Sequence, residues 1–310
     1  MLAAGVDRTG GAVRLLELPD PRPPRAGEVL LDVRACGLGN WDEIVRTGGW
    51  DTGVQPPMAL GVEAAGLVAA VGDSVPGIRV GDAVTTHSLP LREQGCWAGN
   101  FIAAAEHVAP VPTGVSFDAA AALPVPALTA DQAVTDAVEA RAGQTILVHG
   151  AGGVTGGLLV QLAAHHGARV IATAGAASAS RIRAMGAAHV LDYHQADWPE
   201  QVRALTDGGA DAAVNAARSG ARDAVRAVRD GGRLATITGD LPGRERAITM
   251  TAVLVAPDGA RLRRLIPLLE QGAISMAIGA WYPLEAAAEA MARVQQGTHG
   301  EAVVLRPGPA

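Results

Sequence analysis

Short apolar runs separated by Gly, Pro and Asp fill roughly the first 120 residues of the chain. The runs at residues 28–34 and 66–71 are bounded in this way, and the sequences Val75-Pro76-Gly77 and Val80-Gly81-Asp82 stand between runs. Bounded runs of this length are typical of β-strands, and the separating sequences are typical of tight turns. The pattern therefore predicts a β-rich first domain.

The pattern changes near residue 120, and from residue 144 apolar runs alternate with stretches of helical periodicity. We predict strands at residues 145–149, 169–173, 188–193, 211–216, 233–238 and 248–255. We predict helices at residues 158–166, 178–185, 198–205 and 220–229. Strands and helices that alternate in this way form βαβ units, and right-handed crossovers between them give a doubly wound parallel sheet. The pattern thus predicts an α/β chain with a doubly wound second domain.

The last 55 residues show a helix at 259–271, a strand at 274–280, a helix at 284–296 and a strand at 301–305. We expect this tail to return to the first domain. The predicted division is therefore residues 1–120 with 256–310 in one domain, and residues 121–255 in the Rossmann domain.

The composition is that of a globular chain with a sizeable core, because 49% of the 310 residues are hydrophobic and 18% are charged. No apolar run approaches the ~20 residues that span a bilayer, and no signal-like leader opens the chain. Two cysteines, Cys36 and Cys96, cannot build a disulfide framework. We therefore expect no membrane partner and a cytoplasmic location.

The charge pattern excludes several functions. The net charge is −6 and the basic residues do not cluster, so no nucleic-acid partner is expected. All 25 basic residues are arginine, because the sequence contains no lysine. This excludes a lysine Schiff base, a P-loop lysine and a pyridoxal-binding lysine. A small-molecule substrate is the remaining expectation.

The strongest single motif is the glycine-rich stretch from Ile146 to Gly157, which follows a predicted strand and opens a helix. Its glycines permit a tight turn and close approach of a pyrophosphate, and the helix N-terminus offers free N–H groups to phosphates. The predicted cofactor-binding positions are Gly150, Gly152, Gly153, Val154, Thr155 and Gly156. The alternative is a glycine-rich packing turn that binds no nucleotide.

The end of the second Rossmann strand indicates which dinucleotide is bound. An NAD site places an acidic residue there to hold the ribose 2′-hydroxyl, but residues 172–176 contain no carboxylate. Ser178, Ser180 and Arg181 follow, and an arginine with hydroxyl donors suits a 2′-phosphate. The sequence therefore favours NADPH, with Ser178 and Arg181 as ligands, although Arg181 could equally be a solvated helix residue.

Several further segments match one family together with the glycine-rich turn. They are Arg34-Ala35-Cys36-Gly37-Leu38-Gly39-Asn40-Trp41-Asp42, Gly61-Val62-Glu63-Ala64-Ala65-Gly66, Val71-Gly72-Asp73, Val80-Gly81-Asp82-Ala83-Val84, Ala121-Ala122-Leu123-Pro124, Val190-Leu191-Asp192-Tyr193 and Pro257-Asp258-Gly259. The sequence resembles the medium-chain dehydrogenase/reductase superfamily over nearly its whole length. It is most similar to the zinc-independent quinone oxidoreductase branch, which includes the zeta-crystallin-like NADPH:quinone reductases.

The resemblance implies a GroES-like β domain beside the Rossmann domain, with a cleft between them. It also implies NADPH, hydride transfer to quinones, enones or related activated double bonds, and a homodimer formed through the edge strand at 248–255. The alternative for this strand is that it is covered by its own chain. Zinc-dependent relatives place a Cys where Gly39 stands and a His where Val62 stands, and neither residue here offers a ligand atom. With only Cys36 and Cys96, the structural-zinc loop is also absent, so no metal is expected.

The resemblance places Asn40 near the nicotinamide, where its amide could donate to a carbonyl; the alternative is a residue that caps a turn. Places where relatives often carry tyrosine align by eye with Trp50 and Trp97. With Trp41, these are predicted to form an apolar wall for a planar substrate, or else ordinary core packing. Asp42 is expected to have a structural role near a helix N-terminus, with membership of a proton relay as the alternative. Glu63 is expected to be a buried charge paired with an arginine.

Further cofactor contacts are expected beyond the turn. The resemblance places Tyr193 near the 2′-phosphate, Thr129 on the nicotinamide side, and Val253 and Leu254 around the nicotinamide. Asn215 and Thr238 stand at the carboxyl ends of predicted parallel strands, the edge of an open α/β sheet that faces the ligand.

The function predicted from these features is NADPH-dependent, zinc-independent reduction of a quinone or an α,β-unsaturated carbonyl compound. Two alternatives remain open, because a fold does not fix a function. One is a biosynthetic tailoring enzyme that uses the same cleft for a non-redox step such as cyclisation. The other is a non-catalytic NADPH-binding sensor.

Overall fold

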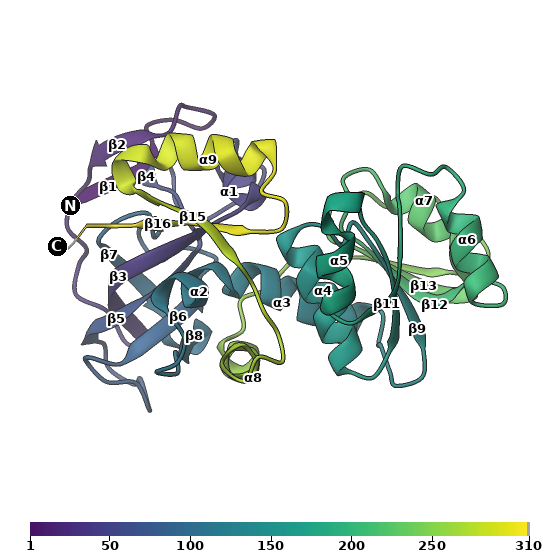
Figure 1. Cartoon of the computed structure of the whole chain (residues 1–310). Coiled ribbons are helices and arrows are strands. Elements are labelled where there is room, and N and C mark those ends of the chain that lie inside the picture. The colour runs from purple at the N-terminus through teal and green to yellow at the C-terminus, as the bar shows by residue number, and fades with distance from the viewer. Residues whose placement is uncertain (309–310) are drawn as a thin grey trace. The chain divides into compact units, whose positions relative to one another are not determined.

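The computed structural model of the chain describes residues 1–308 and divides it into two compact units (Figure 1). The first unit contains Met1–Val125, Ala256–Gln271 and the chain from Ala277 onward; the second contains Pro126–Val255 and Gly272–Met276. The first boundary lies at residues 125 and 126, where the sequence pattern had placed it at 120 and 121. It falls inside a continuous helix, α3 (Pro124–Gln132), which the composition change at residue 120 does not reveal.

The second unit is built on a six-stranded sheet in the order β11-β10-β9-β12-β13-β14, in which every neighbouring pair is parallel. Its strands are β9 (Thr145–His149), β10 (Arg169–Thr173), β11 (Ala187–Leu191), β12 (Ala210–Asn215), β13 (Val228–Thr236) and β14 (Thr249–Ala252). The order reverses between β9 and β12, the point at which ligands bind to open α/β sheets. The predicted doubly wound fold is confirmed.

Helices cover both faces of this sheet. They are α4 (Val154–His165), α5 (Ala176–Ala184), α6 (Trp198–Leu205) and α7 (Ala221–Arg226), and a π-helical turn at Ala133–Ala137 follows α3. Figure 1 shows α4 and α5 together on one side of the sheet, with α6 and α7 on the other. The core beneath α6 and α7 joins Trp198 and Val225 of these helices to Leu147 and Ile171 of the sheet.

The first unit contains a seven-stranded sheet in the order β15-β16-β3-β5-β6-β8, with β7 also pairing with β3, and a small sheet in the order β2-β1-β4. Its strands are β1 (Leu2–Val6), β2 (Arg14–Glu17), β3 (Glu28–Leu38), β4 (Met58–Ala59), β5 (Glu63–Val71), β6 (Ala83–His87), β7 (Asn100–Ala104), β8 (Val108–Pro110), β15 (Ile278–Pro283) and β16 (Ala302–Arg306). Because β16 pairs antiparallel with β3, the tail of the chain returns to this unit.

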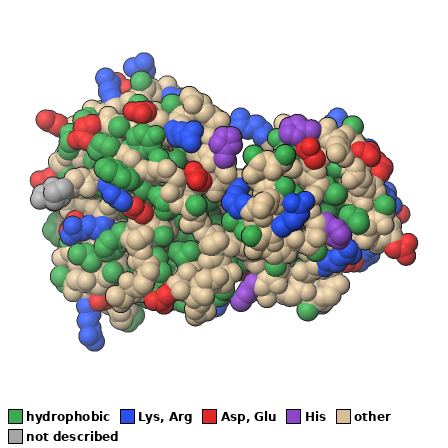
Figure 2. All heavy atoms as spheres, viewed as in Figure 1, with side chains coloured by type: hydrophobic (Ala, Val, Ile, Leu, Met, Phe, Trp, Pro, Cys, Tyr) green, Lys and Arg blue, Asp and Glu red, His purple; other side chains and the backbone are tan. Residues whose placement is uncertain are grey.

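The helices of the first unit are short. They are α1 (Asn40–Arg46), α2 (Phe117–Ala122), α8 (Gly259–Glu270) and α9 (Ala287–Gln296), with 3-10 turns at Ala105–His107 and Leu284–Ala286. Among the residues described, no helix combines the length and the apolar character that a membrane span requires. Figure 2 shows side chains of both charges scattered over the visible face instead of forming one basic patch.

Three predicted strands were wrong in their extent. The strand expected at 233–238 is longer and starts earlier, as β13 (Val228–Thr236). The strand expected at 248–255 is only Thr249–Ala252. The strand expected at 274–280 begins instead at Ile278. Residues 272–276 form a loop of the second unit, because the Ser275 backbone exchanges hydrogen bonds of 2.7 and 2.9 Å with the Gln161 amide of α4.

Candidate functional site

The glycine-rich turn connects β9 to α4, as the sequence predicted. Gly150 follows the strand directly in a left-handed conformation with a φ of +85°, and a Cβ there would lie 2.7 Å from the backbone nitrogen of Ala217. A Cβ on Gly156, in the first turn of α4, would lie 2.3 Å from the Gly150 carbonyl oxygen. Both positions therefore require glycine, so that the turn and the helix can approach each other closely.

Gly153 has a different role in the turn. It is the N-cap of the twelve-residue helix α4, with a φ of −80°, and a Cβ there would meet no atom within 4 Å. Val154 and Thr155 are the first two residues of the helix, whose leading N–H groups have no intrahelical acceptor. Space beside Gly153 and free donors at the end of a helix suit the pyrophosphate of a dinucleotide.

The predicted 2′-phosphate ligands lie on the neighbouring helix α5. Arg181 Nη2 donates a hydrogen bond of 2.7 Å to the Gly152 carbonyl oxygen, so the guanidinium lies against the glycine-rich turn. The Ser178 hydroxyl oxygen is 3.4 Å from the place where a Gly152 Cβ would be. The structure thus brings Ser178, Arg181 and Gly152 together, although they lie up to 29 residues apart.

Tyr193 follows β11 at the same edge of the sheet and is 48% exposed. Its ring lies 4.1 Å from that of His194, and a Cβ on Gly175 would be 3.6 Å from the Tyr193 ring. His194 in turn contacts Asp192 at 2.7 Å, and its backbone N–H and ring lower the pKa of that carboxyl. His194 is a neighbour of the candidate site that sequence pattern indicates only through its place next to Tyr193.

Asn215 ends β12 and is completely buried. Its amide nitrogen donates to Thr236, Thr238 and Asp240 oxygens at 3.0 to 3.2 Å, and its amide oxygen accepts from the Ala217 N–H. The side chain is therefore committed within the protein. It holds the ends of β12 and β13 together, and any effect of Asn215 on a cofactor acts through these neighbours.

Asp240 is a member of this network that the sequence analysis missed. It accepts hydrogen bonds from the Thr238 hydroxyl and from the N–H of Ala221, the first residue of α7. Partial burial raises the pKa of Asp240, but bonds from Thr238, Ala221 and Thr236 outweigh this effect and lower it below the ordinary value. In the sequence, a carboxylate two residues after Thr238 is the feature that could have indicated this network.

The remaining predicted cofactor contacts lie in loops and at a helix. Val253 follows β14 directly, and its N–H donates to the Thr236 carbonyl at 2.8 Å. Leu254 is 75% exposed, which is unusual for a large apolar side chain. Thr129 is half-buried on α3.

Asn40 is the first residue of α1 in the first unit, and its side chain is exposed. The cap of this helix is Gly39, so Asn40 is not the turn-capping residue of the alternative interpretation. The ring of Trp41 lies over Gly39, where a Cβ would be 2.2 Å from the ring. Trp41 is half-buried, and its indole nitrogen is buried without a hydrogen-bond partner in the described chain.

The other two tryptophans differ in exposure. Trp97 has no exposed surface and packs under Gly61, where a Cβ would lie 2.2 Å from the indole. Trp50 is half-buried in the loop after α1. This placement favours core packing for Trp97, and a role of Trp41 and Trp50 in a substrate pocket stays a prediction.

Asp42 and Glu63 are both buried to 1% exposure in the first unit. Asp42 accepts a hydrogen bond of 2.9 Å from the Gly39 N–H, and Glu63 accepts one of 2.7 Å from the Val125 N–H. Loss of hydration raises the pKa of Asp42 to about 8 and that of Glu63 well above its ordinary value. The expectation that Glu63 pairs with an arginine was wrong, because its partner is a backbone N–H.

Two thiols and an imidazole lie in the same interior. The Cys36 thiol donates to the Cys96 carbonyl at 2.9 Å, and the Cys96 thiol donates to the Glu63 carbonyl at 3.0 Å. Burial is the largest cause of the raised pKa of Cys96, so its thiol is not nucleophilic. Burial also lowers the pKa of His87 to about 4, so the ring is neutral near pH 7.

His149, the last residue of β9, belongs to the second unit and is mostly buried. One ring nitrogen contacts the Thr173 hydroxyl at 2.7 Å, and the ring stacks on Trp198 with 4.6 Å between centroids. Burial lowers the pKa of His149.

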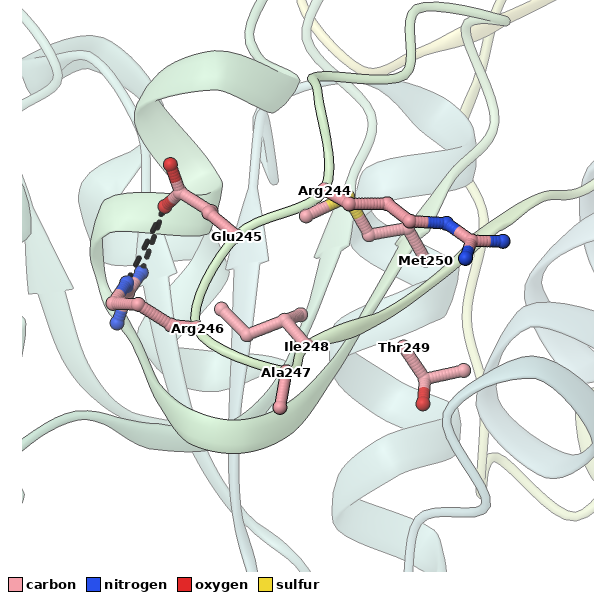
Figure 3. A pocket seen from close by; sticks show the side chains of 7 residues that line it. All are labelled: Arg244, Glu245, Arg246, Ala247, Ile248, Thr249 and Met250. Atoms are coloured by element: carbon pink, nitrogen blue, oxygen red, sulfur yellow. Dashed lines mark hydrogen bonds and ion pairs between the residues drawn. The ribbon is translucent and has the colours of Figure 1, made fainter.

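A cavity of about 580 Å³ lies elsewhere in the second unit, along the loop that leads into β14. It is lined by residues 244–250 and contains none of the predicted cofactor or substrate positions. Figure 3 shows Glu245 and Arg246 joined by an ion pair on one side and Arg244 extending toward the other. The candidate site is the glycine-rich turn, because this turn combines free helix donors with close backbone approach.

Within the described residues, no three His, Cys, Asp or Glu side chains gather with a geometry that could hold a metal ion. At the position of Gly39, a Cβ would also collide with the Trp41 ring.

Two family models match the chain. "Alcohol dehydrogenase GroES-like domain" matches residues 25–116, and "Zinc-binding dehydrogenase" matches residues 185–304. Among curated proteins, the mouse quinone oxidoreductase is 28% identical over 293 residues, covering 89% of this chain and 87% of its own length. The zebrafish synaptic vesicle membrane protein VAT-1 homolog is 36% identical over 188 residues, which is 60% of this chain but only 38% of that protein.

Solved structures are similar over almost the whole chain. A structure described as an NAD-dependent alcohol dehydrogenase has a TM-score of 0.88 and 31% identity, covering 99% of this chain and 100% of its own. A mycobacterial protein complexed with NADPH has a TM-score of 0.85 and 30% identity, with the same coverage. The chain therefore belongs to the medium-chain dehydrogenase/reductase superfamily of oxidoreductases, in its quinone oxidoreductase-like branch.

Proposed function

We propose that the protein is a zinc-independent reductase that uses NADPH to transfer hydride to a quinone or an α,β-unsaturated carbonyl compound. The observation that carries the proposal is the strand–turn–helix cradle at Gly150–Gly156, with Arg181 and Ser178 beside it and no carboxylate at the end of β10. These features fit a dinucleotide with a 2′-phosphate.

The residues present can hold each part of this cofactor. The first N–H groups of α4 and the open space at Gly153 would take the pyrophosphate. Arg181, Ser178 and Tyr193 would take the 2′-phosphate and the adenosine. When bound, the dihydronicotinamide supplies the hydride.

The protein's own contribution to the reaction is orientation and polarisation. The exposed Asn40 amide can donate a hydrogen bond to the carbonyl oxygen of an acceptor, which stabilises the negative charge that develops there. Trp41 and Trp50 would offer flat apolar surface to a planar ring. Glycine at position 39, valine at position 62 and the Trp41 ring over Gly39 support a reaction without zinc.

The experiment that tests the proposal follows absorbance at the reduced-nicotinamide band. Purified protein is mixed with NADPH or NADH and a panel of quinones and enones. We expect oxidation of NADPH that depends on one class of acceptor. If calorimetry detects NADPH binding but no acceptor causes oxidation, the sensor or the non-redox tailoring enzyme becomes the better description.

Cofactor preference is tested separately, since the relatives include both an NAD-dependent description and an NADPH complex. We expect Arg181→Ala to weaken NADPH binding about tenfold while leaving NADH binding nearly unchanged, because a charged hydrogen bond to a phosphate is lost. Arg183→Ala is the matched control, since Arg183 is an exposed arginine on the same helix. Equal losses for the two cofactors would show that Arg181 does not bind the 2′-phosphate.

We further propose that the protein is a cytoplasmic homodimer formed through β14. This strand pairs with β13 on one side and ends the sheet on the other, within the described chain. An uncovered edge strand is a pairing surface. Light scattering gives the mass, and Thr251→Pro, which removes a backbone donor from the edge strand, is expected to shift a dimer toward monomer.

A further inference from the structure

Six buried polar atoms without a hydrogen-bond partner gather in one part of the first unit. The described chain contains seven such side-chain atoms, and only His107 Nδ1 lies outside this group. The six are Trp41 Nε1, Asp42 Oδ1, Glu63 Oε1, His87 Nε2, Ser88 Oγ and Trp97 Nε1. Folded proteins satisfy nearly all buried polar groups, so a concentration of exceptions requires an explanation. We call these six groups the orphan cluster.

Backbone geometry places four of the six groups, those of Glu63, His87, Ser88 and Trp97, around the start of β5. Glu63 and His87 are directly opposite each other on the antiparallel strands β5 and β6, so their side chains lie on one face. The Ser88 N–H donates to the Val62 carbonyl at 2.8 Å, which places Ser88 beside the same strand. Trp97 Nε1 lies 2.6 Å from the Cβ position of Gly61, two residues before Glu63.

The cluster contains both donors and acceptors. The two indoles and the serine hydroxyl donate and the neutral imidazole nitrogen accepts, while a carboxyl oxygen accepts when ionised and can donate when it carries a proton. Groups of both kinds in one interior can be bridged by water, which donates and accepts at once.

The two carboxyls of the cluster have no countercharge. No basic side chain pairs with Asp42 or Glu63 in the described chain, and the nearby Asp42 carboxyl adds to the burial that raises the pKa of Glu63. The other titratable groups around them are the thiols of Cys36 and Cys96 and the neutral ring of His87, beyond which lies His107. Ionisation of two buried carboxyls without a countercharge is costly, which favours retention of protons.

We propose that Asp42 and Glu63 form a proton-holding pair, which keeps at least one proton at neutral pH and serves as the internal proton source for the reduction. The role as a proton source rests on the proposed function, because reduction of a conjugated carbonyl consumes one proton for each hydride. Both residues are positioning residues in this reaction, since they act through bridging water and not by touching the substrate.

The step is a proton transfer without redox change. A carboxylic O–H bond breaks and the carboxylate keeps the electron pair. A new O–H bond forms on bridging water, which passes one of its own protons onward. Solvent later returns a proton to the carboxylate. The pair thus alternates between two protonation states and is restored in each turnover.

Infrared spectroscopy of the resting protein, without cofactor or acceptor, tests whether the proton is held. We expect the carbonyl stretch of a protonated carboxylic acid at pH 7, and we expect Glu63→Gln or Asp42→Asn to change or remove it. A glutamine oxygen can still accept from the Val125 N–H, so Glu63→Gln should fold. If Glu63→Gln and Asp42→Asn each remove only a band of an ionised carboxylate and leave the protonated-acid region unchanged, the proposal is overturned.

Glu28→Gln is the matched control for the infrared measurement. Glu28 is also a buried glutamate of the first unit, but its carboxylate contacts the Arg22 guanidinium at 2.7 Å and the pKa of Glu28 is lowered, chiefly by that hydrogen bond. The control should lose a carboxylate band and keep the acid band. Elemental analysis completes the test, because a divalent cation bound to Asp42 and Glu63 would mean that both are ionised, against the proposal.

Single-turnover kinetics test whether the held proton is used. We expect Glu63→Gln to slow NADPH oxidation about tenfold or more, to change its pH profile and to alter its solvent isotope effect, with NADPH affinity unchanged. A protonated-acid band in the wild type together with unaltered kinetics in Glu63→Gln would overturn the role as a proton source. If the wild type oxidises no NADPH with any acceptor, the proposed function fails, while the infrared result still decides whether the pair holds a proton.

Discussion

The two units treat their buried polar groups in opposite ways. In the second unit, the Asn215 amide reaches the oxygens of Thr236, Thr238 and Asp240 and accepts from a backbone N–H. In the first unit, Asp42 and Glu63 each have one bonded oxygen and one buried oxygen without a partner. A saturated network fixes the ends of strands, whereas an unsaturated one stores free energy that a ligand, water or proton can release.

The largest expected effect concerns the cradle of the second unit. Gly153→Asp should weaken NADPH binding at least about 100-fold, because a carboxylate would face the pyrophosphate where the helix now offers only N–H donors. The fold should persist, since a Cβ at this position meets nothing within 4 Å and the φ of −80° suits any residue. Isothermal titration calorimetry measures the affinity.

Gly153→Ala is the control for this change, because it adds the side-chain carbon without the charge. Nearly normal affinity in Gly153→Ala and lost affinity in Gly153→Asp would place the phosphates at Gly153. Normal affinity in both variants would mean that the dinucleotide binds elsewhere.

The next effect concerns the stability of the first unit and its dependence on pH. The folded protein raises the pKa of Asp42 to about 8, so it holds this proton more tightly than the unfolded chain does. Stability is therefore fully present below pH ~4, the ordinary range of a carboxyl, and decreases as the pH rises toward 8. Asp42→Asn should remove this loss and stabilise the protein by on the order of a few kcal/mol above pH 8.

Urea unfolding at a series of pH values measures this difference. Asp73→Asn serves as the control, because Asp73 is exposed and its replacement should leave the pH dependence unchanged. If the free energy of unfolding changes with pH in the same way in the wild type and in Asp42→Asn, burial does not disfavour ionisation of Asp42.

The smallest effect concerns the saturated network. Asn215→Ala should lower the free energy of unfolding by about 1–3 kcal/mol, because the buried Thr236 hydroxyl and the partly buried Asp240 carboxylate lose a donor. Asn100→Ala is a suitable comparison, since Asn100 is half-buried and makes no side-chain hydrogen bond within the described chain. Equal stability of the two variants would contradict a structural role for the Asn215 amide.

Sequence pattern predicted the second unit better than the first because its signals are local. The strands at 145–149 and 169–173 and the helix at 198–205 have the bounds that we predicted, and each lies between clear turn residues. The edge strand β14 is shorter than its apolar run, because an edge strand has fewer partners to extend it. Residues 272–276 left the predicted strand because Gln161, over 100 residues away, binds their backbone.

The residues of the candidate site differ in the same way, because some depend on local sequence and others on contacts with distant parts of the chain. The spacing of the glycines predicted the turn at Gly150 and Gly156. Backbone atoms a few residues away and the neighbouring Ala217 backbone leave no room for a side chain at these two positions. The environment of Glu63 could not be predicted in this way, because its partner is a backbone N–H 62 residues away. Burial of Trp97 likewise depends on its packing under Gly61 and not on its neighbours in the sequence.

The stacked pair of His149 and Trp198 gives the second unit a built-in optical reporter. Trp198 is the indole that lies against the last residue before the glycine-rich turn. Its ultraviolet emission overlaps the absorption band of a dihydronicotinamide, so energy transfer should dim it when a reduced dinucleotide binds. A protonated imidazole quenches indole emission, but the lowered pKa of His149 keeps the ring neutral near pH 7. In a variant that keeps only Trp198 of the five tryptophans, emission would therefore separate two events, with ligand arrival seen at neutral pH and protonation of His149 seen only in acid.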